Sequence, residues 1–323
     1  MKAIRVHALG GPEVLKYEDV PEPVLQPGEA LVRVEAAGVN FIDIYQRMGV
    51  YKLQLPVTLG LEGSGTVQSV GEGVSGLKAG DRVAWTSIQG AYAELSAVPA
   101  DRLVILPAGV TTKQGAAMML QGMTAHYLAC STYPLKPGDV CLVHAGAGGV
   151  GLLLTQVAKL RGARVITTVS TPEKAHLSHD AGADRVVLYQ DEDFEAAVKQ
   201  FTDGRGVQVV YDSVGKTTVG KSINCLSRRG MLVLFGQSSG VVETIDPLVL
   251  SQKGSLFFTR PTLVHYIATR AELDERAADL LSWIAGGRLK LRTEFEFVLR
   301  DAALAHQALA ARRTTGKVLL IPA

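Results

Sequence analysis

The chain has 323 residues, 47% of them hydrophobic and 20% charged, which suits one or two domains with buried cores and excludes a mainly disordered protein. Its formal net charge of +2 gives no electrostatic case for binding nucleic acid or an anionic membrane surface. The three cysteines, Cys130, Cys141 and Cys225, form neither a disulfide framework nor a CxxC metal pair, so we expect a reducing compartment and a cytoplasmic protein.

No signal peptide and no membrane span are expected. The N-terminus lacks the long apolar core of a signal peptide. The most apolar window, residues 140–158, contains His144, Gln156 and four glycines, which is typical of a strand, a turn and a helix.

Residues 1 to about 122 predict a β-rich domain. Short alternating or apolar runs, separated by turns rich in Gly and Pro, indicate strands at residues 30–34, 65–70, 82–85, 92–98 and 103–106. Even spacing of short strands favours a barrel or a distorted sandwich. One helix is expected near residues 40–48.

From about residue 124, strands and helices alternate. We expect strands at residues 140–144, 164–169, 185–188, 207–211, 231–235 and 255–259. An apolar helix should end near residue 160, and others should cover residues 172–181, 193–201 and 217–226. Six strands alternating with helices predict an α/β fold with a doubly wound parallel six-stranded sheet.

The C-terminal part changes character again. Residues 271–284 predict an amphipathic helix, residues 301–312 a second helix and residues 317–321 a last strand. This pattern favours a return of the chain to the first domain.

A glycine cluster follows the first strand of the α/β region. Gly146-Ala147-Gly148-Gly149-Val150-Gly151 fits the pattern G-x-G-x-x-G between a strand and a helix, the context in which that pattern binds a dinucleotide. Glycines let a pyrophosphate approach the backbone, and the N–H groups that open the helix meet its negative charge. The alternative is a glycine-rich turn that serves only packing.

The end of the second strand favours NADPH over NADH. An acidic residue there would bind the ribose 2′-hydroxyl, but the strand ends Thr168-Val169-Ser170-Thr171. Ser170 and Lys174 would instead accept a 2′-phosphate, although Lys174 could equally be a solvated helix lysine. Tyr189 either packs on the adenosine ribose or is ordinary packing at a strand end.

Several motifs together resemble one family. They are Gly10-Gly11-Pro12-Glu13-Val14-Leu15, Gly38-Val39-Asn40-Phe41-Ile42-Asp43, Gly60-Leu61-Glu62-Gly63, Gly80-Asp81-Arg82-Val83, the glycine loop and Tyr211-Asp212-Ser213-Val214-Gly215. With them the chain resembles the medium-chain dehydrogenase/reductase superfamily, in its zinc-free quinone oxidoreductase (zeta-crystallin-like) branch. The resemblance implies a GroES-like substrate domain from both chain ends, residues 1–123 and 262–323, around a Rossmann NADPH-binding domain, residues 124–261.

The resemblance also indicates a reaction without metal. Zinc members place a cysteine where Asn40 stands and a histidine where Leu61 stands, and neither Asn nor Leu replaces these ligands. His176 and His179 are the one spaced histidine pair, on a helix expected to be exposed. Without zinc the acceptor must already be electrophilic, so we expect a quinone or another activated carbonyl compound.

The family implies which residues surround the reacting groups. NADPH is expected in the cleft between the domains. Asn40, Asp43, Tyr45 and Tyr51 resemble the wall that faces nicotinamide and substrate. Asn40 would contact the nicotinamide, and either Tyr45 or bulk water would supply the proton to the quinol oxygen. Asp43 would position Tyr45 or cap a helix.

The resemblance further suggests a set of cofactor contacts: Thr124, Gly149, Val150, Ser213, Phe235, Gly236, Ser238, Arg260 and Arg313. The two arginines would meet the diphosphate or the 2′-phosphate, unless each is a surface salt bridge. The apolar strand at residues 255–259 would lie at a sheet edge, so we predict a homodimer through the Rossmann-domain edge strands.

Two other functions remain open from the sequence. An NADPH-dependent enone or 2-alkenal reductase would share the fold and cofactor but reduce an activated C=C bond. The second is a protein that binds NADPH without turnover or that binds RNA. RNA binding is disfavoured, because the sequence has no basic stripe and no RNP-like aromatic pattern.

Overall fold

The structure is a computed structural model that describes residues 1–322, and these form two compact units. One, here called the split unit, consists of Met1–Met123 together with the segment from Ile267 to the end of the described chain. The other, the central unit, is Thr124–Tyr266. Helix α2 (Thr112–Tyr127) crosses the boundary between them along the chain, and a π-helical turn, Leu128–Thr132, follows it.

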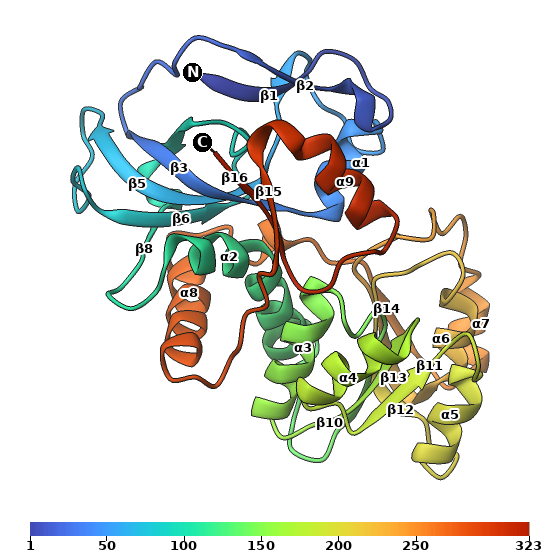
Figure 1. Cartoon of the computed structure of the whole chain (residues 1–323). Helices are drawn as coiled ribbons and strands as arrows, with labels where there is room; N and C mark the ends of the chain where they lie inside the picture. Colours follow the sequence, from blue (N-terminus) through green and yellow to red (C-terminus); the bar gives the residue numbers. More distant parts are fainter. Residues whose placement is uncertain (323) are drawn as a thin grey trace. The chain divides into compact units, whose positions relative to one another are not determined.

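The central unit is built on a six-stranded parallel sheet (Figure 1). Its strands are β9 (Val140–Val143), β10 (Arg164–Val169), β11 (Arg185–Leu188), β12 (Val207–Asp212), β13 (Leu226–Leu234) and β14 (Phe257–Thr259). Between them lie α3 (Gly149–Leu160), α4 (Pro172–Asp180), α5 (Phe194–Phe201), α6 (Val219–Asn224) and α7 (Pro247–Gln252).

The strand order is β11-β10-β9-β12-β13-β14, so the chain winds outward in one direction from β9 and then returns to wind outward in the other. This order confirms the predicted doubly wound parallel sheet. In such sheets ligands bind outside the carboxyl ends of the strands where the winding reverses, which here is between β9 and β12.

Local sequence explains where the helices of the central unit begin. The Thr171 hydroxyl accepts a hydrogen bond from the Lys174 N–H, and Pro172 occupies the first turn of α4. Asp193 caps α5 by accepting from two backbone N–H groups. Apolar residues from the sheet and its helices form one buried cluster, including Leu142, Ile166, Val210 and Leu232.

The predicted boundaries around α6 and β13 are wrong. The expected helix over residues 217–226 is shorter, because α6 ends at Asn224 and Leu226 already belongs to β13. That strand begins well before the predicted residue 231, and its pairing with β12 shifts register between Val207 and Val209. The turn-like Arg228-Arg229-Gly230 therefore lies within a strand, with Arg229 at φ +58°.

The split unit contains two sheets. The seven-stranded sheet has the order β15-β16-β3-β5-β6-β8, with β7 also paired to β3, and the three-stranded sheet has the order β2-β1-β4. The strands are β1 (Lys2–Val6), β2 (Leu15–Asp19), β3 (Glu29–Val39), β4 (Val57–Thr58), β5 (Glu62–Val70), β6 (Arg82–Thr86), β7 (Leu95–Pro99), β8 (Val104–Ile105), β15 (Phe295–Val298) and β16 (Val318–Ile321). The helices are α1 (Phe41–Arg47), α8 (Arg270–Ala285) and α9 (Ala302–Ala310), besides most of α2.

The C-terminal strand completes the sheet that the N-terminal segment begins. β16 pairs antiparallel with β3, with Val318 opposite Val39, and β3 pairs antiparallel with β5 (Figure 1). The predicted β-rich domain made from both chain ends is therefore confirmed. The end of β3 and the starts of β5 and β16 meet at one side of this sheet, where α1 begins.

Two sequence expectations for the split unit need correction. The strand predicted over residues 92–98 starts only at Leu95, because Tyr92 is bonded to the Leu59 carbonyl and Ala93 forms an isolated bridge with Ala3. Helix α2 was not predicted, because Gly115 and Gly122 interrupt its sequence. In the structure these glycines allow close packing, since a Cβ at Gly115 would lie 2.7 Å from the Ser64 Oγ.

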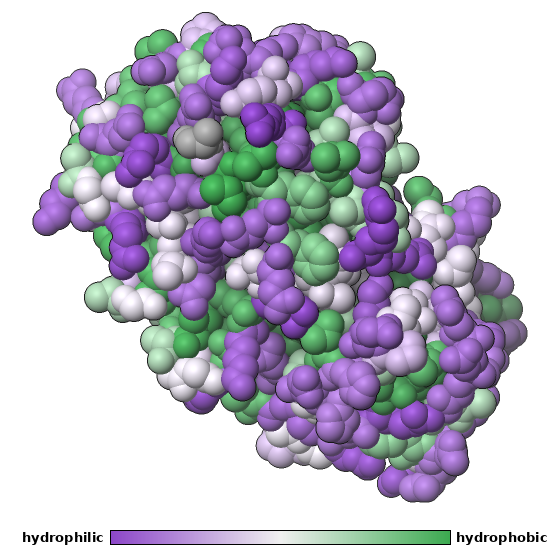
Figure 2. All heavy atoms as spheres, in the orientation of Figure 1, coloured by the Kyte–Doolittle hydropathy of each residue, from purple (hydrophilic) through white to green (hydrophobic). Residues whose placement is uncertain are grey.

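No helix within residues 1–322 is long and apolar enough to cross a membrane. Hydrophilic side chains cover much of the molecular face in Figure 2, with hydrophobic ones among them. Among the described residues, no group of three His, Cys, Asp or Glu side chains could hold a metal ion.

Candidate functional site

The carboxyl edge of the central sheet gathers most of the predicted cofactor residues. Because its strands are parallel, their carboxyl ends lie along one edge. The glycine loop follows β9, and the other residues follow the remaining strands: Ser170 after β10, Tyr189 after β11, Ser213 after β12, Phe235, Gly236 and Ser238 after β13, and Arg260 after β14.

The glycine loop is shaped by close backbone approach. A Cβ at Gly151 would lie 2.2 Å from the Ala145 carbonyl oxygen, and one at Gly146 would lie 2.6 Å from the Thr167 Cβ. Gly148 differs, because its nearest neighbour would be the Ala145 oxygen at 3.2 Å. Gly146 and Gly151 are therefore required by packing, whereas a Cβ at Gly148 would make one tight contact that a shift of a few tenths of an ångström relieves.

The start of α3 presents backbone donors to a ligand. Gly148 is the N-cap residue and has no side chain to cap the helix. The first N–H groups of an α-helix have no intrahelical acceptor, and the helix dipole favours an anion there. This end of α3, which also carries Gly149 and Val150, fits the pyrophosphate of a dinucleotide.

A buried hydrogen-bond chain supports the loops at the centre of this edge. His144, which follows β9, lies 2.9 Å from the Thr168 Oγ1 through Nδ1 and 3.0 Å from the Ser222 Oγ through Nε2. Since the Ser222 hydroxyl donates to Asp212, it accepts from His144, which therefore carries its proton on Nε2. Burial lowers the pKa of His144, so the imidazole is neutral.

Asp212 fixes the loop that carries Ser213. Its carboxylate accepts from the Val214 N–H at 2.8 Å and the Gly215 N–H at 2.9 Å, as well as from the Thr218 hydroxyl. This buried carboxylate holds the β12 loop directly beside the glycine loop. Sequence reasoning quoted Asp212 within a motif but gave it no role.

The loops after β12, β13 and β14 are joined by hydrogen bonds. The Ser238 N–H donates to the Ser213 carbonyl, and a Cβ at Gly236 would lie 2.6 Å from that same oxygen. Arg260 donates to the Gln237 Oε1 at 2.8 Å and to the Gly236 carbonyl at 3.4 Å. These residues form one surface over which a ligand backbone can lie closely.

Ser170 and Lys174 lie within one turn of each other at the β10 end of the edge. Ser170 immediately follows β10, and Lys174 is in the first turn of α4. The only acidic side chain in that first turn is Glu173. Tyr189, after β11, is 41% exposed and lies in the next loop of the edge.

In the split unit, three aromatic rings line up on and after α1. Phe41 and Tyr45 have ring centroids 6.0 Å apart, and Tyr45 and Tyr51 have centroids 6.1 Å apart. Tyr51 is exposed and Tyr45 is half-buried. Tyr45 and Tyr51 are therefore brought together, as the predicted wall requires.

Asp43 belongs to a buried cluster on the inner side of α1. Its Oδ2 accepts from the Asn40 N–H at 2.8 Å and from the Tyr92 hydroxyl at 3.0 Å, and the Tyr92 hydroxyl lies 3.2 Å from the His306 Nε2. Burial raises the pKa of Asp43 to about 7. Burial and then the charge of Arg47 lower the pKa of His306 to about 3. Asp43 thus caps the start of α1.

Asn40 lies in a second buried cluster. Its Nδ2 donates to the Glu62 Oε2 at 2.9 Å and to the Gly38 carbonyl at 3.3 Å. Its Oδ1 accepts from the Lys317 Nζ at 2.9 Å and from the Gln121 Nε2 at 3.3 Å. Sequence reasoning assigned no role to Glu62 or Lys317, which lie 255 positions apart and form an ion pair.

Thr124 and Arg313 belong to neither the carboxyl edge of the central sheet nor α1. Thr124 is buried in α2, and Arg313 is exposed after α9, with its backbone N–H bonded to the Ala308 carbonyl. Their contacts with a cofactor stay predictions, as do the individual roles of the other site residues.

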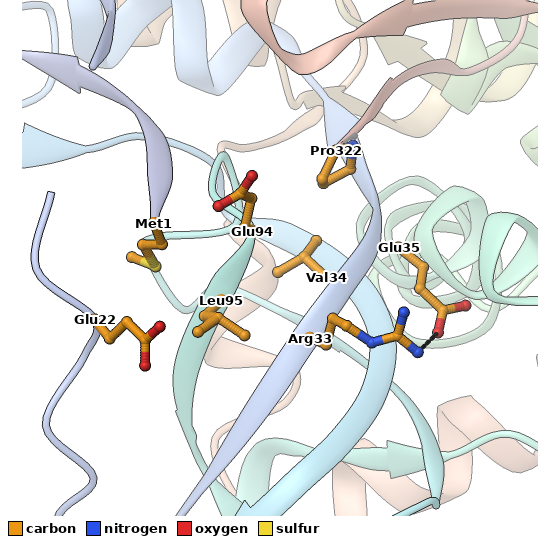
Figure 3. A pocket seen from close by; sticks show the side chains of 8 residues that line it. All are labelled: Met1, Glu22, Arg33, Val34, Glu35, Glu94, Leu95 and Pro322. Carbon is orange, nitrogen blue, oxygen red and sulfur yellow. Dashed lines mark hydrogen bonds and ion pairs between the residues drawn. The ribbon is translucent and has the colours of Figure 1, made fainter. Parts of the chain in front are cut away.

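A surface pocket in the split unit holds none of the predicted site residues. Figure 3 shows that it is lined by Arg33, Glu35, Glu94 and neighbouring side chains, with Arg33 and Glu35 paired at 3.5 Å. Its acidic character does not suit an anionic dinucleotide.

Comparison with known proteins shows that the chain is similar to dehydrogenases and reductases. Residues 26–108 match the alcohol dehydrogenase GroES-like domain, and residues 149–285 match the family described as zinc-binding dehydrogenase. The quinone oxidoreductase of Pseudomonas aeruginosa is 47% identical over 323 residues, which cover 99% of each chain. The 2-haloacrylate reductase of a Burkholderia species is 40% identical over 326 residues, covering 98% of each.

A solved structure agrees over the full length. The crystal structure of Escherichia coli quinone oxidoreductase complexed with NADPH superposes with a TM-score of 0.98 at 45% identity, and the match covers 100% of both chains.

Proposed function

The chain belongs to the quinone oxidoreductase (zeta-crystallin-like) family of the medium-chain dehydrogenase/reductase superfamily, and from this premise we propose that it reduces quinones with NADPH without a metal ion. The observation that carries the proposal is the carboxyl edge of the central sheet, where a glycine loop and an uncapped α3 suit a dinucleotide. The full-length likeness to quinone oxidoreductases supports the acceptor class.

The residues of this edge would divide the work of holding NADPH. The start of α3 would bind the pyrophosphate, and Ser170 with Lys174 would bind the 2′-phosphate. Ser213, Gly236 and Ser238 offer a smooth surface for the rest of the dinucleotide, and Arg260 adds a cation. When bound, NADPH supplies a hydride to the acceptor.

The residues near α1 that could serve as metal ligands indicate which class of compound accepts the hydride. Asn40 and Leu61 supply no thiolate and no imidazole, so these positions offer poor ligands for Zn²⁺. A quinone accepts a hydride without a strong Lewis acid and takes up one proton to become the hydroquinone. Tyr45, half-buried beside the exposed Tyr51, is the proposed donor of that proton, with bulk water as the alternative.

The proposal is tested by comparing acceptors. Initial rates of NADPH oxidation are measured with a 1,4-benzoquinone and with an α,β-unsaturated ketone under the same conditions. We expect kcat/KM to be higher for the quinone. The likeness to 2-haloacrylate reductase favours the enone reductase as the second candidate. An enone kcat/KM about 100-fold above that of the quinone, about 2.7 kcal/mol in transition-state free energy, would replace the proposal with that candidate.

Cofactor choice gives a further prediction. We expect a preference of at least about tenfold for NADPH over NADH in kcat/KM. In Lys174→Ala the KM for NADPH should rise more than that for NADH, because only NADPH carries a 2′-phosphate. Lys199→Ala, on α5 and paired with Glu195, is the matched control and should leave both KM values unchanged. Equal effects of Lys174→Ala on both cofactors would remove Lys174 from the phosphate site.

Three further parts of the assignment are proposals. The domain boundaries at residues 123/124 and 261/262 would separate a substrate domain from an NADPH-binding domain. A homodimer would form through β14, which ends the central sheet. A cytoplasmic location is supported by the three cysteines, none of which forms a disulfide within residues 1–322; fractionation of the source cells tests it.

A further inference from the structure

We propose that Glu62 and Lys317 are positioning residues of the hydride-transfer site, which hold Asn40 and thereby the start of α1. This inference rests on the proposed function, because it concerns the wall that carries Tyr45. Glu62 lies in a motif quoted above but was given no role, Lys317 was not singled out by the sequence, and neither is placed against the reacting groups.

Asn40, Glu62 and Lys317 form a closed triangle in which each side chain contacts the other two. Lys317 donates to Glu62 and to the Asn40 Oδ1, and Asn40 donates to the Glu62 Oε2. Glu62, Lys317 and Asn40 are 0%, 2% and 4% exposed. The triangle is thus a fully desolvated polar unit in the core of the split unit.

Each corner of the triangle comes from a different strand. Asn40 follows β3, Glu62 opens β5 and Lys317 immediately precedes β16. Helix α2 closes the cluster, since the Leu120 N–H donates to the Glu62 Oε1 at 2.6 Å and Gln121 donates to Asn40. A Cβ at Gly38 would lie 2.3 Å from the Glu62 Oε2, so the backbone of β3 is fitted to the carboxylate.

The Asn40 side chain has no spare hydrogen-bonding capacity. An amide offers two N–H donors and two acceptor positions on its oxygen, and all four are used by Glu62, Gly38, Lys317 and Gln121. Any direct contact of Asn40 with a nicotinamide would have to displace one of these bonds. The geometry therefore favours a role for Asn40 as an anchor.

The anchor acts on α1 because Asn40 is its N-cap residue. The Asn40 backbone N–H is bonded to Asp43, and Tyr45 lies two residues further along the helix. A tilt of Asn40 would move the start of α1 and the Tyr45 ring with it. Shifts of about 1 Å at a reacting site can cost about 100-fold in rate.

An ordinary structural ion pair is the rival explanation. Removing one partner of a buried pair leaves an uncompensated charge and destabilises the fold, so a single substitution cannot separate the two roles. Two double variants can, because both remove the ion pair while only one keeps an amide beside Asn40.

The experiment compares Glu62→Gln/Lys317→Met with Glu62→Leu/Lys317→Met. The first retains an acceptor and a donor for the Asn40 amide, and the second retains neither. We expect kcat of the first within about threefold of wild type and that of the second at least about tenfold lower, with the NADPH Kd within about twofold in both. Thermal unfolding verifies that both are folded. Lys113→Met, which removes the exposed pair with Glu296, is the control and should change nothing.

A second readout is independent of turnover. Hydrogen–deuterium exchange of residues 41–47 in the cofactor-free protein should be faster in Glu62→Leu/Lys317→Met than in Glu62→Gln/Lys317→Met. Equal kcat and equal exchange in the two double variants would overturn the proposal. If the leucine variant does not fold, Lys317→Met and Lys317→Gln give the same comparison at one position. A wild type that reduces no quinone would refute the proposed function, while the exchange comparison would still decide the positioning role.

Discussion

Asp43 shows how burial sets the chemistry of a single residue in this fold. Burial is the largest influence on its carboxyl and raises its pKa to about 7, against hydrogen bonds from the Asn40 N–H and Tyr92 and the charge of Lys317, which lower it; the charge of Glu62 raises it. Asp43 is therefore close to half protonated at neutral pH. In the unfolded chain the group returns to its ordinary pKa near 3.8.

This difference predicts a pH-dependent stability. Because the folded state holds the proton more tightly, the stabilisation is present below the ordinary pKa and is lost as pH rises through about 7. The unfolding free energy of wild type minus that of Asp43→Asn should fall by about 4 kcal/mol between pH 4 and pH 7.5. Urea unfolding across this range measures it.

His306 also changes its pKa on folding, so the quantity to measure is the difference in unfolding free energy between wild type and Asp43→Asn. Its lowered pKa has the opposite sign, with stability present above pH 6.5 and lost as pH falls towards 3. Both proteins contain His306, so its contribution cancels in the difference. A difference that stays constant with pH would show that the pKa of Asp43 is the same in the folded and unfolded states.

Residues that act through neighbours in sequence could be predicted, and those that act through distant partners could not. Asn40 and Asp43 share a short motif, and the interpretation of Asp43 as a helix cap or a positioning group follows from that motif. The contacts of Glu62 with Lys317 depend on β5 and β16 both meeting the end of β3, which only the fold reveals. The sequence signal that could have identified Glu62 and Lys317 is a charged residue inside a glycine-rich or apolar run.

At the scale of elements, the loop between β9 and α3 separates packing from ligand binding. Gly151→Ala should destabilise the protein by about 2 kcal/mol or more, because the new Cβ meets a backbone oxygen. Gly148→Ala should lower the melting temperature less than Gly151→Ala does, yet raise the NADPH Kd by at least about tenfold, since the methyl group would occupy the proposed path of the pyrophosphate. Thermal unfolding and fluorescence titration measure these effects.

Gly220 provides the matched control. It lies in α6 of the same unit, and a Cβ there would meet no atom within 4 Å. Gly220→Ala should leave NADPH binding unchanged and stabilise the fold slightly, by about 0.5–1 kcal/mol. Unchanged NADPH binding in Gly148→Ala would place the pyrophosphate elsewhere.

Elements with strong local signals were predicted well, and those that depend on tertiary contacts were not. β10 and β11 match their predicted residues because each is a compact apolar run between turns. β1, β2, β4 and β15 were missed, since each is specified by its partners in the sheet. Helix α2 was missed because glycine usually interrupts a helix, whereas here it permits close packing.

At the scale of the whole molecule, the exposed edge of the central sheet predicts self-association. β14 ends the sheet, and its Phe257 and Phe258 are 56% and 36% exposed. An apolar edge strand of this kind can pair with a second copy. We expect light scattering to give a dimer mass for wild type and a monomer mass for Phe257→Lys. Leu304→Lys, at an equally exposed position on α9, should remain dimeric. A monomeric wild type would contradict this.

We propose that this protein reduces acceptors that are already electrophilic and needs no divalent metal. The most direct measurement is the rate of NADPH oxidation by a 1,4-benzoquinone before and after exhaustive chelation, with the zinc content of the same samples determined. We expect equal rates in both samples and no oxidation of a simple alcohol with NADP⁺. Stoichiometric zinc whose removal abolishes turnover, together with oxidation of the alcohol, would contradict it.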